Sequence, residues 1–221
     1  IKSSESNVLQ TAYEITASSD PNGEDVIWNS GRIASDASQH VLWDGPALSS
    51  GEKVYWKVRV ETKNDSAVSP TAAFEMGLLH HSDWQAEWIE PEDSIDPDAY
   101  KPAPYLRKEF DVKAGLVQAR IYQSAHGLYE FWINGERGTQ DVFKPGFTSY
   151  YARTQVQAYD ITSLLAPGRN CWAVALGDGW WRGKTGGITR NNFGYKVSFI
   201  GQIVLTFADG TTEVIASDTR F

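Results

Sequence analysis

One stretch decides the fold class of this chain: Val54-Tyr55-Trp56-Lys57-Val58-Arg59-Val60-Glu61. Its even-numbered residues are apolar and fall on one face of an extended backbone, whereas the tyrosine and the charged residues fall on the other. This period of two predicts a half-buried antiparallel strand. Tyr13, Ile15 and Ala17 alternate in the same way upstream, and the β-prone residues 73–76 follow downstream. Several short strands within residues 1–79 predict a small two-sheet sandwich.

The same alternation returns in the second half of the chain. Apolar residues recur at every second position in three further segments, which are residues 129–133, 172–176 and 203–215. Asn134-Gly135 adds a strong hairpin-turn signal directly after the first of them. These segments predict a larger β-sandwich over residues 105–221, of the jelly-roll type.

Two segments of this second half are less regular. Residues 105–112 alternate, but Lys108 interrupts the apolar face, so the pattern leaves the inward side of this strand open. Asp160 precedes the short apolar run of residues 161–165 and is the one helix-capping signal of the chain. The expected fold class is therefore all-β, with at most one helical turn.

Residues 80–104 differ in amino-acid composition from the segments on either side. They are acidic and rich in proline, which marks a junction between two domains. The apolar run Trp84–Ile89 inside this junction is expected to lie on a protein surface. His80-His81 falls in the same segment, and a solvated connection is favoured there over a metal site.

Composition excludes several classes of protein. Hydrophobic residues make up 41% of the 221 residues and aromatic residues 13%, enough for a real core, and no apolar run is long enough to span a bilayer. The formal charge of −8 argues against nucleic acid and anionic membranes as partners. Cys171 is the only cysteine, so no internal disulfide is possible. The chain begins at Ile1 without a signal region, so we expect it to be a piece of a longer protein. The sequence leaves the compartment open between cytoplasmic and secreted.

The usual catalytic motifs are missing from the sequence, among them phosphate-binding loops and zinc-binding patterns. Glycosidic hydrolysis needs two facing carboxyl groups, and Glu130 and Asp178 can be nominated as such a pair. Nothing in the sequence sets the distance between them, so an enzyme complete in itself is the disfavoured hypothesis.

The most unusual segment is residues 177–187, where Trp180 and Trp181 stand among five glycines with Asp178 and Arg182 beside them. Aromatic faces stack on sugar rings, and charged groups bind sugar hydroxyls. The segment therefore indicates either carbohydrate contact or packing against another domain. The competing interpretation is that one tryptophan closes the mouth of the sandwich and the glycines permit tight turns.

We expect the two tryptophans to differ in exposure. Consecutive residues of an extended segment point to opposite sides. One ring should be buried in its own sandwich and the other exposed.

Asp141, Asn191 and Asn192 are oxygen-rich candidates for a metal site. Carboxylate and amide oxygens suit Ca²⁺ better than Zn²⁺. Turn-forming Asn and Asp are the alternative interpretation of the same residues. Calcium is the one cofactor that the sequence nominates.

Several motifs resemble one known family. Residues 8–15, Trp28-Asn29-Ser30-Gly31-Arg32, residues 66–77 and Asp83-Trp84-Gln85-Ala86-Glu87-Trp88-Ile89 resemble the first domain and the junction of bacterial α-L-rhamnosidases of glycoside hydrolase family 78. Residues 127–135, Pro145-Gly146-Phe147-Thr148-Ser149-Tyr150 and Gly177-Asp178-Gly179-Trp180-Trp181 resemble successive motifs of the β-sandwich that follows. Their order and spacing cover almost the whole chain.

The resemblance implies a fold and a function. It implies a fibronectin type III-like sandwich at residues 1–79, N-terminally truncated, a junction at 80–104 and a jelly-roll-like sandwich at 105–221. In this family the hydrolysis of terminal α-L-rhamnosides takes place in a helical (α/α)₆ barrel, for which this chain has no helices, so no catalytic residue can be carried over. The chain is expected to be a non-catalytic N-terminal region that scaffolds that barrel, with the barrel and rhamnosides as partners. Trp180 matches the aromatic residue of the last motif, which implies that it is the outward, ligand- or barrel-facing tryptophan.

An independent L-rhamnose-binding module is the alternative that the resemblance implies. Some family members have a related sandwich that binds L-rhamnose through calcium. Asp141 matches the position of an acidic ligand in that module, and Asn191 or Asn192 falls near a second one. Val142 departs from the pattern, because a further polar ligand is expected there.

Overall fold

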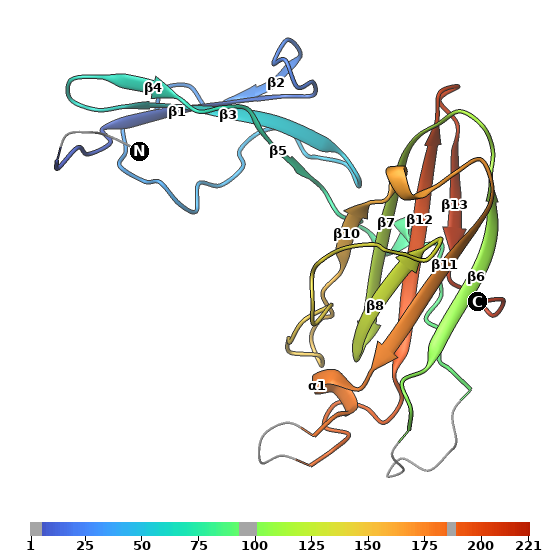
Figure 1. The fold of residues 1–221 in the computed structure, drawn as a ribbon. Coiled ribbons are helices and arrows are strands. Elements are labelled where there is room, and N and C mark those ends of the chain that lie inside the picture. The colour runs from blue at the N-terminus through green and yellow to red at the C-terminus, as the bar shows by residue number, and fades with distance from the viewer. Residues whose placement is uncertain (1–5, 93–100, 185–188) are drawn as a thin grey trace. The chain divides into compact units, whose positions relative to one another are not determined.

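The computed structural model describes residues 6–92, 101–184 and 189–221. The chain divides into two compact units, unit 1 (Ile1–Leu79) and unit 2 (His80–Phe221), as Figure 1 shows. Both units are built from antiparallel strands, so the predicted all-β class is confirmed. Within the described ranges, no helix is long and apolar enough to cross a membrane.

Unit 1 contains one antiparallel sheet in which β3 is central. The strands follow the order β2-β1-β3-β4, and β5 also pairs with β3. Their bounds are β1 (Ala12–Ser18), β2 (Val26–Asn29), β3 (Lys53–Glu61), β4 (Ser66–Val68) and β5 (Ala72–Glu75). On β3, Val54 is buried and Lys57 and Arg59 are exposed, which confirms the alternation that predicted this strand.

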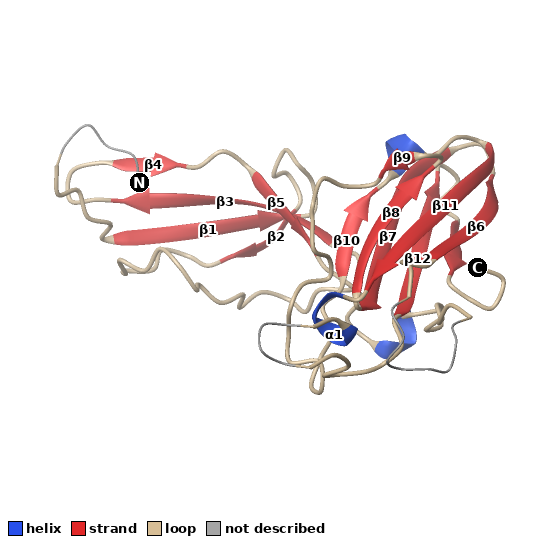
Figure 2. Cartoon of the chain, turned by 60° about the horizontal axis from the view of Figure 1, so that its bottom comes forward, coloured by secondary structure: helices blue, strands red, loops and turns tan. Residues whose placement is uncertain are grey.

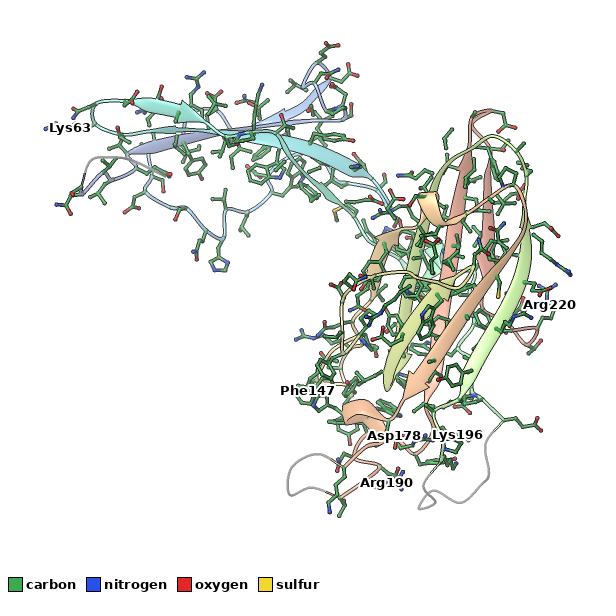
Figure 3. All side chains as sticks on the ribbon, viewed as in Figure 1. Lys63, Phe147, Asp178, Arg190, Lys196 and Arg220 are labelled. Atoms are coloured by element: carbon green, nitrogen blue, oxygen red, sulfur yellow. The ribbon has the colours of Figure 1, made fainter. Side chains whose placement is uncertain are left out.

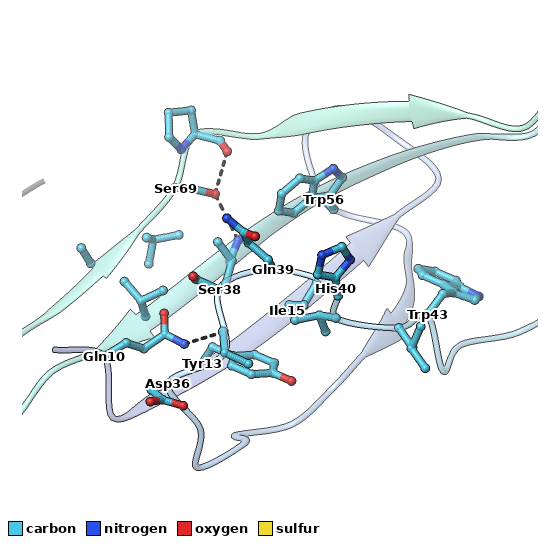
Figure 4. Close-up of a pocket in the computed structure, with 18 of the residues that line it drawn as sticks. Gln10, Tyr13, Ile15, Asp36, Ser38, Gln39, His40, Trp43, Trp56 and Ser69 are labelled. Atoms are coloured by element: carbon cyan, nitrogen blue, oxygen red, sulfur yellow. Dashed lines mark hydrogen bonds between the residues drawn. The ribbon is translucent and has the colours of Figure 1, made fainter. Parts of the chain in front are cut away.

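The second layer of unit 1 differs from the expected sandwich. All strands of the described part of unit 1 belong to one sheet, and the irregular residues 36–43 line a groove together with residues of β1 and β3 (Figure 4). The likeness to fibronectin type III stays a prediction.

The described strands of unit 2 form two four-stranded antiparallel sheets, which can be followed in Figure 2. One sheet has the order β10-β7-β12-β13 and the other β6-β11-β8-β9. The bounds are β6 (Tyr105–Val112), β7 (Leu116–His126), β8 (Leu128–Ile133), β9 (Glu136–Arg137), β10 (Gln157–Asp160), β11 (Gly168–Gly177), β12 (Ser198–Phe207) and β13 (Thr212–Ala216). Buried side chains from both sheets form one hydrophobic core, as a sandwich requires.

The alternation read from the sequence places the correct residues in this core. On β11, Trp172, Val174 and Leu176 are buried, and on β8 the alternate residues Tyr129, Phe131 and Ile133 are buried as well. The expected hairpin at residues 203–215 is the antiparallel pair β12–β13. Asn134 and the glycine after it both have positive φ, which is the geometry of the tight turn predicted between β8 and β9.

Lys108 lies on the inward side of β6, which the sequence pattern left open. Its Nζ is 2.8 Å from the Asp218 carboxylate and 2.8 Å from the Ala216 carbonyl oxygen, and it lies over the Phe221 ring. The alkyl stem can therefore share a face with Phe110 and Val112 because the ammonium group finds polar partners at the margin of the core.

The strand β7 was not predicted, although it is one of the two inner strands of its sheet. Ala119, Ile121 and Ala125 are fully buried core residues, but Gln123 is fully buried with them. Tyr122 and Ser124, on the opposite face, are buried too. A strand buried on both faces loses the alternation on which sequence-based assignment depends.

The junction packs onto unit 2, as expected for its apolar run. Ile89 forms a β-bridge with Phe199 of β12, and the Glu87 backbone N–H donates to the Ser217 carbonyl oxygen at 2.9 Å. His81 begins a short 3₁₀ turn, η1 (His81–Asp83). Residues 93–100 of the junction lie outside the described residues.

The single helical signal at Asp160 corresponds to one 3₁₀ turn, η2 (Thr162–Leu164). The Asp160 carboxylate accepts the Thr162 backbone N–H at 3.0 Å. A second helical turn, α1 (Gly179–Arg182), was not predicted, and it lies at the segment that the sequence singled out for its tryptophans.

Candidate functional site

The candidate site is the end of unit 2 that carries α1, referred to below as the α1 end. It is formed by residues 139–156, which follow β9, and residues 177–197, which join β11 to β12. Figure 3 shows Phe147, Asp178, Arg190 and Lys196 gathered there. Residues 185–188 of the glycine-rich segment lie outside the described residues.

Asp178 is held by two arginines. Its Oδ1 accepts from Nε and Nη2 of Arg182 at 2.7 and 2.6 Å, and its Oδ2 is 3.4 Å from Nη2 of Arg190. The Arg182 side chain is only 2% exposed. Two charge-assisted contacts from one buried guanidinium to a single carboxylate oxygen orient both groups strongly. The structure thus brings the predicted residues Asp178 and Arg182 together, and the guanidinium that orients the Asp178 carboxylate is itself buried.

Gly179 allows the chain to turn from β11 into α1. Its φ is +50°, and a Cβ atom at this position would lie 2.6 Å from Cγ of Leu128. Any residue other than glycine would therefore strain the backbone at this φ, and its Cβ atom would clash with Leu128.

The prediction for the two tryptophans is wrong. Trp180 and Trp181 are both half-buried, whereas one buried and one exposed ring were expected. The expectation assumed an extended segment, but the chain is helical from Gly179 to Arg182. Successive residues of a helix are about 100° apart around its axis, so neighbours share a surface instead of facing opposite ways.

Trp181 closes a stack of three rings. Its indole ring is stacked on one face of the His126 imidazole at 4.1 Å between centroids, and Trp88 of the junction is stacked on the other face at 4.2 Å. Its Nε1 donates to the Lys196 carbonyl oxygen at 2.8 Å. Sequence reasoning missed this arrangement because the three residues are distant in the chain and no local pattern links them.

Burial lowers the pKa of His126, and the nearby Glu90 carboxylate opposes that shift. Nδ1 of His126 lies 2.8 Å from Oγ of Ser198. The imidazole is thus held by a hydroxyl and two aromatic faces, a setting that favours its neutral form.

An exposed apolar surface lies next to this stack. Its members are large side chains that are more than half exposed: Val142 (59%), Phe143 (63%), Phe147 (60%) and Tyr151 (80%). Phe143 and Phe147 both contact the ring of Trp180, at 6.2 and 6.1 Å between centroids. We call these four residues together with Trp180 the aromatic patch.

A buried lysine holds the loop that carries the patch. Lys144 is 3% exposed, and its Nζ lies 3.1 Å from the Glu130 carboxylate and 2.5 Å from the Asp141 carbonyl oxygen. Because the lysine points inward, Phe143 on one side of it is turned outward, with a positive φ of 59°. The exposure of the patch is therefore built into the loop by an ion pair beneath it.

A small cavity of about 390 Å³ lies beside the patch. Its lining includes Tyr129, Glu130, Val142 and Phe143. Burial is the main cause that raises the pKa of the Tyr129 hydroxyl. Of the two nominated carboxylates, Glu130 lines this cavity and is ion-paired with Arg137 and Lys144, whereas Asp178 faces its two arginines.

The calcium candidates do not form a fitting donor set. The Asp141 carboxylate accepts from the Tyr159 hydroxyl at 3.1 Å, and its carbonyl oxygen is bound by the Lys144 ammonium group. That ammonium group would repel a second cation at Asp141. The Asn192 carbonyl oxygen accepts from the Tyr151 hydroxyl at 2.9 Å, and the Asn191 backbone N–H donates to the Arg182 carbonyl oxygen at 2.9 Å. Among the described residues, no group of three or more His, Cys, Asp and Glu side chains could hold a metal ion.

Fold and site together define an all-β region whose surface carries an aromatic patch and ion-paired carboxylates. Comparison with known families agrees with this class. Residues 114–221 match the α-L-rhamnosidase N-terminal domain, and residues 1–80 match the Rha78A-like N-terminal immunoglobulin domain. The chain therefore belongs to the α-L-rhamnosidase family, and it matches the N-terminal region of that family.

Individual relatives place the match within longer proteins. An α-L-rhamnosidase of Alteromonas sp. (strain LOR) is 33% identical over 98% of this chain, and one of Formosa agariphila is 34% identical over 96%. A solved structure, the α-L-rhamnosidase of Aspergillus terreus, is 34% identical over 99% of the chain, with a TM-score of 0.86. The chain spans about a quarter of the length of each of these relatives.

Proposed function

We propose that this chain is the non-catalytic N-terminal region of an α-L-rhamnosidase, and that its α1 end docks against the catalytic part of the same polypeptide. The observation that carries the proposal is the aromatic patch, in which Phe143, Phe147 and Tyr151 are each at least 60% exposed. The catalytic part is proposed to be a helical barrel that hydrolyses terminal α-L-rhamnosides.

The energetics favour a covered patch. Clustered apolar side chains of this size on one surface mark interaction sites. Covering one large aromatic side chain stabilises a contact by about 2–3 kcal/mol. The ion pairs of Lys144 and Arg182 hold the two loops in place, so docking orders few additional groups.

The experiment compares two variants of the full-length protein, Phe147→Ser in the patch and Tyr105→Ser on the outer face of β6. Tyr105 is 76% exposed and serves as the matched control. We expect Phe147→Ser to lower the melting temperature and the activity on a chromogenic α-L-rhamnoside, and Tyr105→Ser to change neither. The isolated chain should tolerate both substitutions equally. The proposal would be overturned if Phe147→Ser left the melting temperature and the activity of the full-length protein unchanged. It would also be overturned if the full-length protein had no rhamnosidase activity.

A second candidate function is L-rhamnose binding by unit 2 itself. The 390 Å³ cavity supports it, because Tyr129 and Phe143 offer aromatic surface and Glu130 offers a carboxylate beside it. Calorimetric titration of the chain with L-rhamnose, with and without Ca²⁺, tests this function. Heat that is lost in a Glu130→Gln variant supports it, and no heat at millimolar sugar removes it.

A further inference from the structure

The segments that form the α1 end are basic, although the chain as a whole is acidic. Residues 139–156 and 177–197 contain six lysines and arginines but only two carboxylates, a surplus of four positive charges. The whole chain has a formal charge of −8, so the remainder of the chain carries −12. The six basic residues are Lys144, Arg153, Arg182, Lys184, Arg190 and Lys196. Positive charge is thus concentrated in the segments that also carry the aromatic patch.

Four of these six basic side chains have carboxylate partners within unit 2. Two of them, Arg182 and Arg190, share the carboxylate of Asp178. The other two are Lys144, at 3.1 Å from Glu130, and Lys196, at 2.8 Å from Glu90. These four cations serve the internal structure of unit 2, because each is already compensated by a neighbouring carboxylate.

Arg153 and Lys184 are the two that remain. Both side chains are exposed, and within residues 6–92, 101–184 and 189–221 neither forms an ion pair with a carboxylate. The side-chain partner of Arg153 is neutral, since its Nε donates to Oγ1 of Thr148 at 3.2 Å. These two side chains can therefore offer their charge to a partner without breaking an ion pair of unit 2.

Both cations belong to the elements that present the aromatic surface. Arg153 lies in the same turn as Phe147 and Tyr151, and its hydrogen bond to Thr148 ties its side chain to that turn. Lys184 comes two residues after the end of α1, which carries Trp180. Each of the two segments of the α1 end thus supplies exposed aromatic surface or a tryptophan together with one exposed cation.

We propose that the face of the catalytic part that meets the α1 end is acidic, with carboxylates opposite Arg153 and Lys184 and an apolar centre opposite the aromatic patch. This inference rests on the proposed function, because it names the chemistry of the surface onto which the α1 end docks. Charge complementarity carries it. Contact excludes water from the two cations, and a carboxylate opposite each one compensates the lost hydration, whereas a neutral or basic face would leave them desolvated and unpaired.

The experiment reverses both charges in the full-length protein, in the double variant Arg153→Glu/Lys184→Glu. Thermal unfolding is measured at about 10 mM and at about 1 M NaCl, where the Debye length is about 30 Å and about 3 Å. We expect the variant to lower the melting temperature of the full-length protein by about 3–5 °C at low salt and by less than half of that at high salt. In the present chain alone, which lacks the facing surface, the same variant should change the melting temperature much less at either salt concentration.

Two further variants of the full-length protein complete the experiment. Arg153→Lys/Lys184→Arg keeps both charges and is the matched control, so its melting temperature should equal that of the native protein at both salt concentrations. Arg153→Gln/Lys184→Gln removes the charges without reversing them and should show about half of the effect. It also keeps the inference testable in case the charge-reversed protein does not fold.

Several outcomes overturn the inference. They are an equal loss of stability in the full-length protein and in the present chain, a loss that persists at high salt, and a rise in melting temperature, which would assign a basic face to the catalytic part. Slower migration of the full-length protein in a gel that contains polygalacturonate, abolished by the charge reversal, would assign the two cations to an anionic polysaccharide instead.

The Phe147→Ser variant separates this inference from the proposed function. If Phe147→Ser destabilises the full-length protein and the charge reversal does not, the α1 end docks onto a face that is not acidic, and only the present inference fails. If neither variant has an effect, docking itself is wrong and both proposals fail.

Discussion

The imidazole of His126 is stacked on the indole of Trp181, with centroids 4.1 Å apart and an angle of 11° between the ring planes. His126 ends β7, and Trp181 belongs to α1, so the contact joins the end of a core strand to the proposed docking surface. Trp88 covers the other imidazole face and brings the junction into the same stack. The packing of the α1 end thus depends on stacked rings from three separate segments of the chain.

Trp181→Ala is expected to destabilise unit 2 by about 3 kcal/mol, because it removes the stack on His126 and the hydrogen bond to Lys196. Trp180→Ala should cost only about 1 kcal/mol, since its ring contacts Phe143 and Phe147, which are themselves exposed. Urea unfolding of the two variants measures both values. Equal losses would show that the two rings have the same structural role.

The stability of unit 2 should fall as the pH drops below the ordinary histidine pKa of 6.5. Burial lowers the pKa of His126 in the folded state, so the unfolded chain takes up the proton first and unfolding becomes easier in acid. Above that pH, neutral His126 makes its full contribution to the stability of unit 2. The free energy of unfolding, measured for the native chain and for His126→Gln between about pH 8 and pH 5, tests this. The difference in the free energy of unfolding between the native chain and His126→Gln should become smaller as the pH falls. A difference that stays constant with pH would contradict the prediction.

Gly194→Ala should destabilise the α1 end by about 1–3 kcal/mol. A Cβ atom at Gly194 would lie 2.4 Å from the Trp181 ring, which is already fixed between His126 and its hydrogen bond. Gly177→Ala is the control, because its Cβ would meet only Leu128 at an ordinary 3.8 Å. Thermal unfolding compares them, and a Gly194→Ala protein as stable as the control would show that the ring can move.

Calcium is expected to leave the melting temperature of the chain unchanged, and EDTA likewise. The Asp141 carbonyl oxygen is bound by Lys144, and the Asp141 carboxylate by Tyr159, so the site offers few free oxygens and carries a cation. Differential scanning calorimetry with millimolar CaCl₂ or EDTA measures the effect. A rise in melting temperature with Ca²⁺ that Asp141→Ala abolishes would restore the calcium site.

Local patterns were sufficient for the strands with one buried and one exposed face. The alternation on β3, β8 and β11 and the Asn134-Gly135 turn depend only on neighbours in sequence, and the structure has each of them. The pattern failed at β7, where Gln123 is buried among core residues, and at Trp180 and Trp181, where one helical turn replaces an extended segment.

The candidate site was predicted only in part. The glycine-rich segment pointed to the α1 end, because its clustered tryptophans are unusual for a loop. The sequence held no sign of the partners that decide what those residues do: Arg190 on Asp178, His126 on Trp181, and Lys144 beneath the loop of Phe143.

By itself, the sequence determined the all-β class, the inward residues of most strands and the family resemblance, because hydrophobic periodicity and short motifs are local properties of the chain. Only the tertiary structure decided which side chains are paired, stacked or exposed. Ion pairs such as Asp178 with Arg190, and stacks such as Trp88 with His126, join residues that come together through strand pairing and loop packing. Such contacts depend on the distance between side chains in space, which no local pattern encodes.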